Sequence, residues 1–319
     1  MKKPKRELII ITPVYNDWEC LIDLSKSINE SLKSTDIELL SLVALNDNST
    51  FEFNNGDEVK ISLPFHIVNL AINVGHQRAI AIGLCYVKEK FPSSDFVIVM
   101  DSDGEDLPKY IPELCNKAEQ ENKIVFAGRQ ERSESFFFKI GYYIYKSLFR
   151  LLTSQTIKFG NYSCIPSLMV PKIIVNPDLW NHYSASIIKS KLLFTYIPTK
   201  RGLRYNGKSK MNIQSLIIHG LSSIAVYADV VIAKTLIFII IVLFMIFIAT
   251  IILVGIRTLT DLAVPGWTSS ILIALMNFAA SLFSIILLLL LMQLNQRKQV
   301  FKPVSSFYKD YINSIQTHE

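Results

Sequence analysis

The chain has 319 residues, of which 50% are hydrophobic and 19% charged, and its formal net charge is +6. An ordinary soluble domain is less apolar, so this composition calls for a search for membrane spans. The positive charge lies largely in segments that flank apolar stretches. An anionic membrane surface therefore accounts for it better than nucleic acid, and no nucleic-acid partner is expected.

The first 135 residues alternate short apolar runs with helical patterns. Helical spacing of apolar residues follows Trp18, covers residues 79–87 and returns after Pro108. The intervening runs are Leu8–Thr12, Leu39–Leu45, Phe65–Val68, Phe96–Met100 and Ile124–Ala127. Continuous apolar runs suit the buried strands of a mainly parallel sheet. The alternation predicts a doubly wound α/β domain over residues 1–135.

Four of these runs are followed by polar clusters. In a doubly wound sheet the ligand binds at the carboxyl ends of the strands. The clusters are Tyr15-Asn16-Asp17, Asn46-Asp47-Asn48-Ser49, Asn73-Val74-Gly75-His76 and Asp101-Ser102-Asp103. We expect them to lie along one edge of the sheet and to form a binding site there.

Asp101 and Asp103 flank a serine directly after a Val- and Ile-rich run. Two close carboxylates repel each other unless a cation lies between them, and their hard oxygens favour Mg²⁺ or Mn²⁺ carrying a diphosphate. This interpretation is favoured over a solvated acidic turn. Asp106 opens the next helix, where it either caps the helix or contacts the acceptor. His76 either only starts its helix or donates to a phosphate there.

Residues 136–233 are interpreted as an acceptor-side region. Over residues 136–158, apolar and cationic positions recur at helical spacing, which predicts an amphipathic helix, either in the membrane interface or packed on the protein surface. A second such helix, Met211–Ala233, leads into a long apolar stretch. Between them lies a cationic segment with Lys200, Arg201, Arg204, Lys208 and Lys210. It suits either an anionic lipid head and a departing diphosphate, or anionic lipids without selectivity.

Residues 234–296 hold two uncharged stretches, which predict transmembrane helices at about 235–256 and 267–294. A pair of buried core helices is the disfavoured alternative, because such helices rarely run this long without a polar face. Basic residues gather before the first span and after the second, which places the amino-terminal domain and the tail, residues 297–319, in the cytoplasm. A multi-pass protein of the inner (cytoplasmic) membrane is expected. The four scattered cysteines fit a reducing compartment.

The order and spacing of the motifs resemble family 2 glycosyltransferases. The matching motifs are Ile11-Thr12-Pro13-Val14-Tyr15-Asn16, Asn46-Asp47-Asn48-Ser49, Asn73-Val74-Gly75-His76, Asp101-Ser102-Asp103 and Arg204 through Gly207-Lys208-Ser209-Lys210. Over about residues 7–230 the chain looks like the polyprenyl-phosphate glycosyltransferases, of the bactoprenol glucosyltransferase and dolichol-phosphate mannose synthase type. The two terminal spans match the bactoprenol type.

The resemblance implies an α/β GT-A (Rossmann-like) catalytic domain with juxtamembrane amphipathic helices and a transmembrane hairpin. It also implies that the Pro13–Asn16 loop and Asp47 hold the nucleoside, that Asp101 and Asp103 hold the metal and diphosphate, and that transfer inverts the anomeric carbon. Together with the residue patterns described above, it gives Pro13, Tyr15, Asn16, Asp47, Asn73, His76 and Asp101 as candidate binding residues, and Asp103, Asp106, Arg204, Lys208 and Lys210 as candidate catalytic residues.

Two positions depart from the family pattern. Asn46 stands where an aspartate is usual, which leaves one carboxylate, Asp47, to accept from the base or ribose. Asn161 stands where many relatives carry an aspartate. A hydroxyl acceptor needs a general base, whereas a lipid phosphate is already ionised, so Asn161 favours a phosphate acceptor. The alternative is that Asn161 only stabilises a turn.

The sequence therefore predicts a metal-dependent transferase that moves a sugar from a nucleotide donor, with a UDP-sugar favoured over a GDP-sugar, to a polyprenyl phosphate such as undecaprenyl phosphate. Two alternatives remain: transfer to a hydroxyl on a glycolipid or polysaccharide, and a non-catalytic membrane scaffold that binds nucleotide sugars. The retained aspartates count against the scaffold. The sequence leaves a homo-oligomer open.

Overall fold

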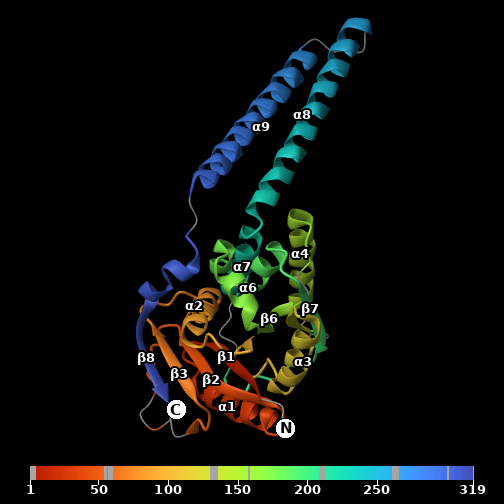
Figure 1. The fold of residues 1–319 in the computed structure, drawn as a ribbon. Helices are drawn as coiled ribbons and strands as arrows, with labels where there is room; N and C mark the ends of the chain where they lie inside the picture. The colour runs from red at the N-terminus through yellow and green to blue at the C-terminus, as the bar shows by residue number, and fades with distance from the viewer. Residues whose placement is uncertain are drawn as a thin grey trace. The chain divides into compact units, whose positions relative to one another are not determined.

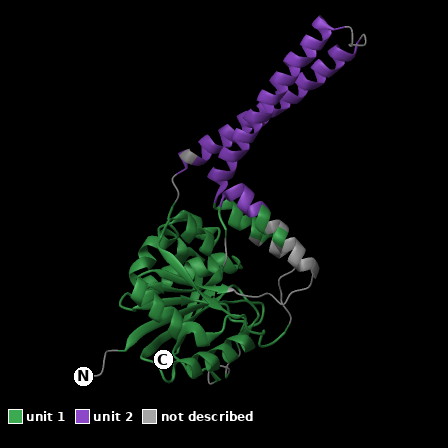
Figure 2. Cartoon of the chain, turned by 90° about the vertical axis from the view of Figure 1, so that its right-hand side faces the viewer, with its two compact units in different colours: residues 1–147, 155–226, 302–319 green, residues 148–154, 227–301 purple. Residues whose placement is uncertain are grey.

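The computed structural model describes residues 5–53, 56, 60–129, 136–156, 159–207, 213–260, 266–299 and 302–318. The chain divides into two compact units, which are coloured separately in Figure 2. Unit 1 comprises residues 1–147, 155–226 and 302–319, and unit 2 comprises residues 148–154 and 227–301.

Unit 1 is built on one eight-stranded mixed sheet (Figure 1). The strands are β1 (Arg6–Val14), β2 (Ile37–Asn46), β3 (Phe65–Leu70), β4 (Phe96–Val99), β5 (Ile124–Arg129), β6 (Phe159–Pro166), β7 (Phe194–Thr199) and β8 (Ile312–His318). Their order across the sheet is β7-β5-β6-β4-β1-β2-β3-β8. The pairs β1–β2, β1–β4, β2–β3 and β5–β7 are parallel, whereas β6 pairs antiparallel with β4 and β5.

Helices cover both faces of this sheet. The α-helices of unit 1 are α1 (Trp18–Leu32), α2 (His76–Lys90), α3 (Ile111–Glu121), α5 (Val170–Ile174), α6 (Tyr183–Lys189) and α7 (Ile213–Ala225), and α4 (Phe136–Thr153) runs from unit 1 into unit 2. Short 3₁₀ helices are η2 (Pro108–Tyr110), η3 (Ser167–Met169), η4 (Pro177–Trp180), η5 (Val304–Ser306) and η6 (Tyr308–Tyr311).

The alternation of side chains along β1 divides the core into two layers. Leu8 and Ile10 pack in a cluster with the apolar faces of α1 and α3, whereas Ile9 and Ile11 pack in a second cluster with α2, α5 and α6. All four side chains are fully buried. A central strand covered on both faces has no polar side, which explains its continuous apolar run.

The sheet is less parallel than the sequence predicted. Strand β6 returns antiparallel beside β4, so its first residues, including Asn161, lie at the same edge as the carboxyl ends of the parallel strands. Residues 159–199, which the sequence assigned to an acceptor-side region, therefore supply two strands of the sheet, β6 and β7. Strands with both faces buried have similar apolar sequences whether they are parallel or antiparallel, so the direction of β6 could not be predicted from the sequence.

The segment after the second apolar helix also differs from the predicted tail. Residues 312–318 form β8, which pairs antiparallel with β3 along its whole length and makes the last strand of the sheet. This segment belongs to unit 1. Its short, mixed polar and apolar sequence carries no strong strand pattern, because one edge and most side chains of β8 stay exposed.

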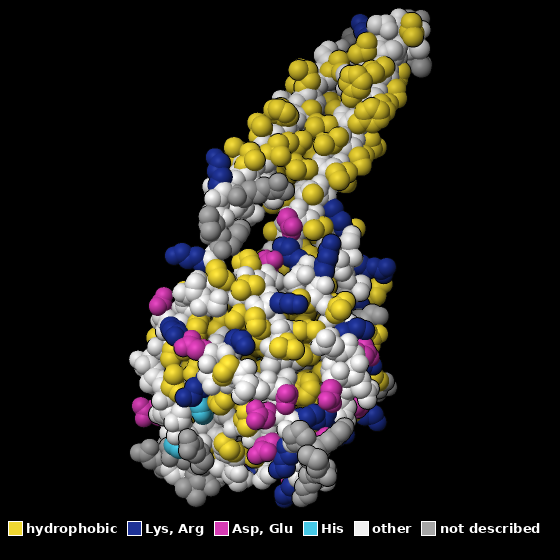
Figure 3. All heavy atoms as spheres, viewed as in Figure 1, with side chains coloured by type: hydrophobic (Ala, Val, Ile, Leu, Met, Phe, Trp, Pro, Cys, Tyr) yellow, Lys and Arg dark blue, Asp and Glu magenta, His cyan; other side chains and the backbone are white. Residues whose placement is uncertain are grey.

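Unit 2 contains two long helices, α8 (Ala228–Leu259) and α9 (Trp267–Lys298). Both are long and apolar enough to cross a membrane, by length and composition. Hydrophobic side chains cover the face of these helices that is seen in Figure 3. The predicted spans were limited to uncharged residues, whereas the helices are longer. Helix α8, for example, includes the charged residues Asp229 and Lys234. The Lys234 ammonium donates to Leu151 O at 2.7 Å, which ties α8 to the end of α4 within unit 2.

Candidate functional site

The four polar clusters meet at one edge of the sheet. The Ser102 hydroxyl donates to Pro13 O at 3.3 Å, which links the ends of β4 and β1. The Asp47 carboxylate, at the end of β2, accepts from the backbone N–H groups of Val74 and Gly75 after β3. His76 begins α2 next to Asp101. Loops far apart in sequence therefore converge on one site in unit 1.

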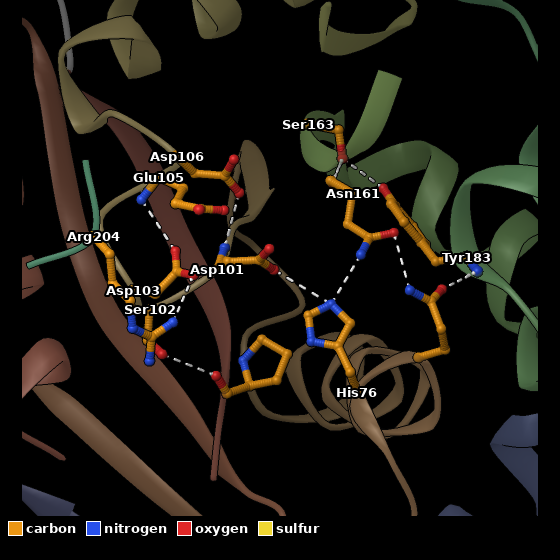
Figure 4. Close-up of polar contacts among 12 residues, drawn as sticks. His76, Asp101, Ser102, Asp103, Glu105, Asp106, Asn161, Ser163, Tyr183 and Arg204 are labelled. Carbon is orange, nitrogen blue, oxygen red and sulfur yellow. Dashed lines mark hydrogen bonds and ion pairs between the residues drawn. The ribbon is translucent and has the colours of Figure 1, made fainter. Parts of the chain in front are cut away.

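Asp101 and Asp103 lie in a tight turn after β4 (Figure 4). The Glu105 N–H donates to Asp103 Oδ1 at 3.0 Å, and the Asp101 N–H donates to Asp106 Oδ2 at 3.0 Å. The following helix starts after Leu107 without a side-chain cap. Asp106 is therefore not an N-cap: its carboxylate closes the turn that presents Asp101.

The charge of Asp103 is held in an unfavourable environment. Burial, and then the neighbouring Asp101 carboxylate, raise the pKa of Asp103 to about 6, against the opposing effect of the Arg204 guanidinium. The Asp103 side chain is 18% exposed. A cation between the two carboxylates would relieve both costs.

The donor atoms present fit a divalent cation. Asp101 Oδ1 is buried, has no hydrogen-bond partner among the described residues, and lies 3.3 Å from His76 Nε2. Among the residues that the structure describes, no group of three or more His, Cys, Asp or Glu could hold a metal ion. Two carboxylates are enough for Mg²⁺ or Mn²⁺ when phosphate oxygens and water complete the coordination shell.

A hydrogen-bond relay fixes the orientation of His76. The Tyr183 N–H donates to Gln77 Oε1 at 2.7 Å, so Gln77 turns its amide nitrogen to Asn161 Oδ1 at 3.3 Å. The Asn161 amide nitrogen then faces His76 Nε2 at 2.8 Å. Because a backbone N–H can only donate, it sets the direction of each later bond, and His76 Nε2 acts as an acceptor. Asn161 thus belongs to a network across α2, β6 and α6, which extends beyond one turn.

The loop after β1 is built by Asn16. Its N–H donates to Ser49 Oγ at 2.9 Å, and its side-chain oxygen accepts from the N–H groups of Thr50 at 2.8 Å and Phe51 at 3.1 Å. Asn16 has φ of 54°, in the left-handed region that asparagine tolerates better than most residues. The adjacent Tyr15 is 41% exposed. Asn16 shapes the loop, and Tyr15 offers an accessible ring beside it.

Asp47 is buried, with 4% exposure, and this burial raises its pKa. Its two oxygens accept from Val74 N–H at 2.7 Å and Gly75 N–H at 2.9 Å. The Asn73 amide nitrogen donates to Asp47 O at 3.1 Å. Asp47 therefore anchors the start of α2, and any contact with a nucleoside uses the lone pairs that remain.

The segment after β7 is held against the Asp103 turn. The Gly202 N–H donates to Glu105 O and the Tyr205 N–H donates to Asp103 O, both at 2.8 Å. The Arg204 guanidinium bridges two carboxylates, Asp103 Oδ2 at 3.0 Å and Asp17 at short range. Arg201 forms an ion pair with Glu105. Lys208 and Lys210 lie outside the described residues.

Two glycines permit this close contact. A Cβ on Gly202 would lie 2.2 Å from Gly104 O, and a Cβ on Gly104 would lie 2.7 Å from the Tyr205 ring. Gly104 also has φ of 91°. Side chains at either position would separate the cationic segment from the Asp101–Asp103 turn.

Several site residues were missed in the sequence. Asp17 was part of a predicted cluster, but only the fold brings it to Arg204 across 187 positions of sequence. Gln77 and Glu105 likewise gain their roles from partners far along the chain. A carboxylate beside a helix start was the one available signal for Asp17, and helix starts favour acidic residues regardless of function.

Comparison with known proteins gives a consistent match for unit 1. The family model described as glycosyl transferase family 2 matches residues 9–171, just over half of the 319 residues. The fold is similar to that of glucosyl-3-phosphoglycerate synthase from Mycobacterium tuberculosis in complex with Mn²⁺ and UDP-glucose, with a TM-score of 0.51, 13% identity, and coverage of 70% of this chain and 79% of that one. The same enzyme with Mn²⁺, UDP-glucose and phosphoglyceric acid matches with a TM-score of 0.52, 12% identity, and coverage of 71% and 80%. At this identity the likeness shows a shared GT-A-like fold.

Proposed function

Because the chain belongs to glycosyl transferase family 2, we propose that it transfers a sugar from a nucleotide-sugar donor to a polyprenyl phosphate at the cytoplasmic face of the inner membrane. The observation that carries this proposal is the position of the cationic segment, residues 200–207. Two backbone hydrogen bonds, from Gly202 and Tyr205, hold this segment against the Asp103 turn. In the chain it is followed by α7 and then by the two long apolar helices. It offers positive charge both to an anionic acceptor and to the departing diphosphate.

The donor side is assigned to the loops after β1, β2 and β4. Tyr15 and the loop stabilised by Asn16 would contact the nucleoside, and Asp101 and Asp103 would hold Mg²⁺ or Mn²⁺ with the diphosphate. When bound, the cation neutralises the charge that develops on the leaving diphosphate. UDP is favoured as the nucleotide, since solved structures of similar fold hold UDP-glucose with Mn²⁺.

The proposed reaction is a single displacement. A phosphate oxygen of the lipid forms a bond to the anomeric carbon, while the bond from that carbon to the diphosphate oxygen breaks and the nucleoside diphosphate leaves. Attack opposite the leaving group inverts the anomeric carbon. Arg204 would lie beside both groups and stabilise the negative charge that moves to the diphosphate.

Asn161, at the same edge of the sheet as Asp101, suits an acceptor that carries its own charge. Asn161 is an amide whose two side-chain atoms contact Gln77 and His76, and it has no proton-accepting carboxylate to offer a hydroxyl. An ionised lipid phosphate needs no such base. Lys200 and Arg201 lie in the same segment as Arg204 and add to its positive charge.

The proposal is tested with the full chain purified in detergent. Radiolabelled sugars from a panel of UDP- and GDP-sugars are offered, with Mn²⁺, to undecaprenyl phosphate and in parallel to undecaprenol. We expect a lipid-extractable product from one donor with the phosphate and none with the alcohol. Product with undecaprenol alone would contradict the phosphate acceptor. Failure of every donor with both lipids, by a protein that unfolds cooperatively on heating, would contradict the proposed reaction.

A further inference from the structure

Strand β8 is joined to the loop on the donor side by an unbroken series of hydrogen bonds. The Asn69 amide nitrogen on β3 donates to Ser314 Oγ on β8 at 3.1 Å. The Asn46 amide nitrogen on β2 donates to Asn69 Oδ1 at 2.7 Å. Asn46 Oδ1 in turn accepts from Ser49 N–H at 2.9 Å, and Ser49 Oγ accepts from Asn16 N–H at 2.9 Å.

The direction of this series is fixed at its loop end. The Ser49 N–H can only donate, so it requires the oxygen of the Asn46 amide, and the nitrogen of that amide must face β3. Asn69 therefore presents its own oxygen to Asn46 and its nitrogen to Ser314. An amide at position 46 accepts and donates at once, whereas a carboxylate accepts only.

The sheet register places the three side chains in one row. Asn46 is the register partner of Asn69 across the parallel β2–β3 pair, and Asn69 is the partner of Ser314 across the antiparallel β3–β8 pair. The backbone ladder thus holds them at neighbouring positions. Without β8, Asn69 would lie on an edge strand with only water on that side.

The loop at the end of this series contains backbone conformations that need support from hydrogen bonds. Asn16 and Asn48 both have φ of 54°, a left-handed conformation that costs free energy in a residue other than glycine. Such conformations persist where surrounding contacts determine them, and here the contacts come from Asn46 and Ser49. Fixing the Asn46 amide therefore limits the conformations open to residues 46–51.

We propose that Ser314, which the chain supplies after its second apolar helix, is a positioning residue for the nucleotide-binding loop and acts through Asn69 and Asn46. The inference rests on the proposed function, since it assigns that loop to the nucleotide. It also gives the segment after the apolar helices a part in donor binding.

The first experiment measures nucleotide affinity in the full chain. UDP and GDP are titrated, each with Mn²⁺, into the wild type, Ser314→Ala and Ser314→Thr. We expect Ser314→Ala to weaken binding of the preferred nucleotide roughly two- to tenfold, the effect of one partly exposed hydrogen bond. The turnover number at saturating donor and the melting temperature should stay near wild type, and Ser314→Thr should restore affinity because it keeps the hydroxyl.

Two further variants separate positioning from general strand stability. Gln316→Ala removes an exposed side chain from the same strand and should leave affinity unchanged. In an Asn69→Ala background, Ser314→Ala should cause no additional loss, since Ser314 acts through Asn69. Equal effects of Ser314→Ala and Gln316→Ala, or fully additive losses with Asn69→Ala, would overturn the proposal.

Hydrogen exchange of the nucleotide-free protein tests the positioning without any ligand. Backbone amides of residues 49–51 should exchange faster in Ser314→Ala than in wild type or Gln316→Ala. Unchanged exchange there would overturn the inference, even if nucleotide binds. If the wild type binds neither nucleotide while exchange rises as expected, the proposed function fails and the positioning of the loop stands.

Discussion

Replacing Asp103 with Asn should stabilise the metal-free protein at neutral pH. The pKa of Asp103 is raised from 3.8 to about 6, mainly by burial and then by the Asp101 carboxylate. A group whose pKa is higher in the folded state contributes stability below its unfolded pKa and loses that contribution as pH rises through its folded pKa. The wild type should therefore lose stability between about pH 4 and pH 6.

The magnitude follows from the difference between the two pKa values. About two pKa units correspond to about 3 kcal/mol, which is the most that Asp103→Asn could recover at pH 7.5. Arg204 loses its charged partner at Asp103 but keeps Asp17, so we expect a net gain of about 1–2 kcal/mol.

The assay is thermal or denaturant unfolding of both proteins in detergent with EDTA, from pH 4 to pH 8. The two curves should agree near pH 4 and separate above pH 6, with Asp103→Asn the more stable. If the variant is less stable at pH 7.5, or if the difference does not depend on pH, the Asp103 carboxylate is not held in the unfavourable environment described above.

Three other consequences concern the same site. Mn²⁺ affinity, measured by paramagnetic resonance without nucleotide, should fall about tenfold from pH 7.5 to pH 5, because a proton competes for an Asp103 carboxylate whose pKa is about 6; a flat profile would contradict this. Gly202→Ala should lower kcat/KM for transfer about 100-fold, because its Cβ would lie 2.2 Å from Gly104 O and displace the cationic segment; near-normal kinetics would show that the segment need not pack this closely. Asp47→Ala should lower the free energy of unfolding by about 1–3 kcal/mol, because it leaves the two N–H groups at the start of α2 without their acceptor; an unchanged denaturation midpoint would argue against that anchoring role.

The sequence was most informative about structural features that residues close together in the chain determine. The buried runs that became β1 to β5 and the polar residues that follow them predicted both the α/β layers and the edge that collects the clusters. This works because the ends of parallel strands meet at one edge whatever the details of packing. The helix starts at Trp18 and His76 could be predicted for a similar reason, because residues next to them in the chain indicate them.

Long-range pairing set the limit of that prediction. Nothing near β8 in sequence indicates that it would pair with β3, and the roles of Arg204 and Asp17 depend on each other across the whole domain. Asn46, noted only as a departure from the family pattern, has its physical explanation in a row of side chains across three strands. Side-chain hydrogen bonds of this kind depend on register, which a single sequence does not specify.

The measurement that tests the central claim most directly is the rate of sugar transfer to undecaprenyl phosphate by wild type and Asp103→Asn, side by side with Mn²⁺ at pH 7.5. Since the metal-free variant should be at least as stable as the metal-free wild type, a loss of rate does not arise from misfolding and reports on the chemistry of the site. We predict metal-dependent product from the wild type, none with EDTA, and a rate at least about 100-fold lower for the variant. Transfer by Asp103→Asn at the wild-type rate, or undiminished product in EDTA, would contradict the assignment of the Asp101–Asp103 turn as the site that holds the metal and the diphosphate.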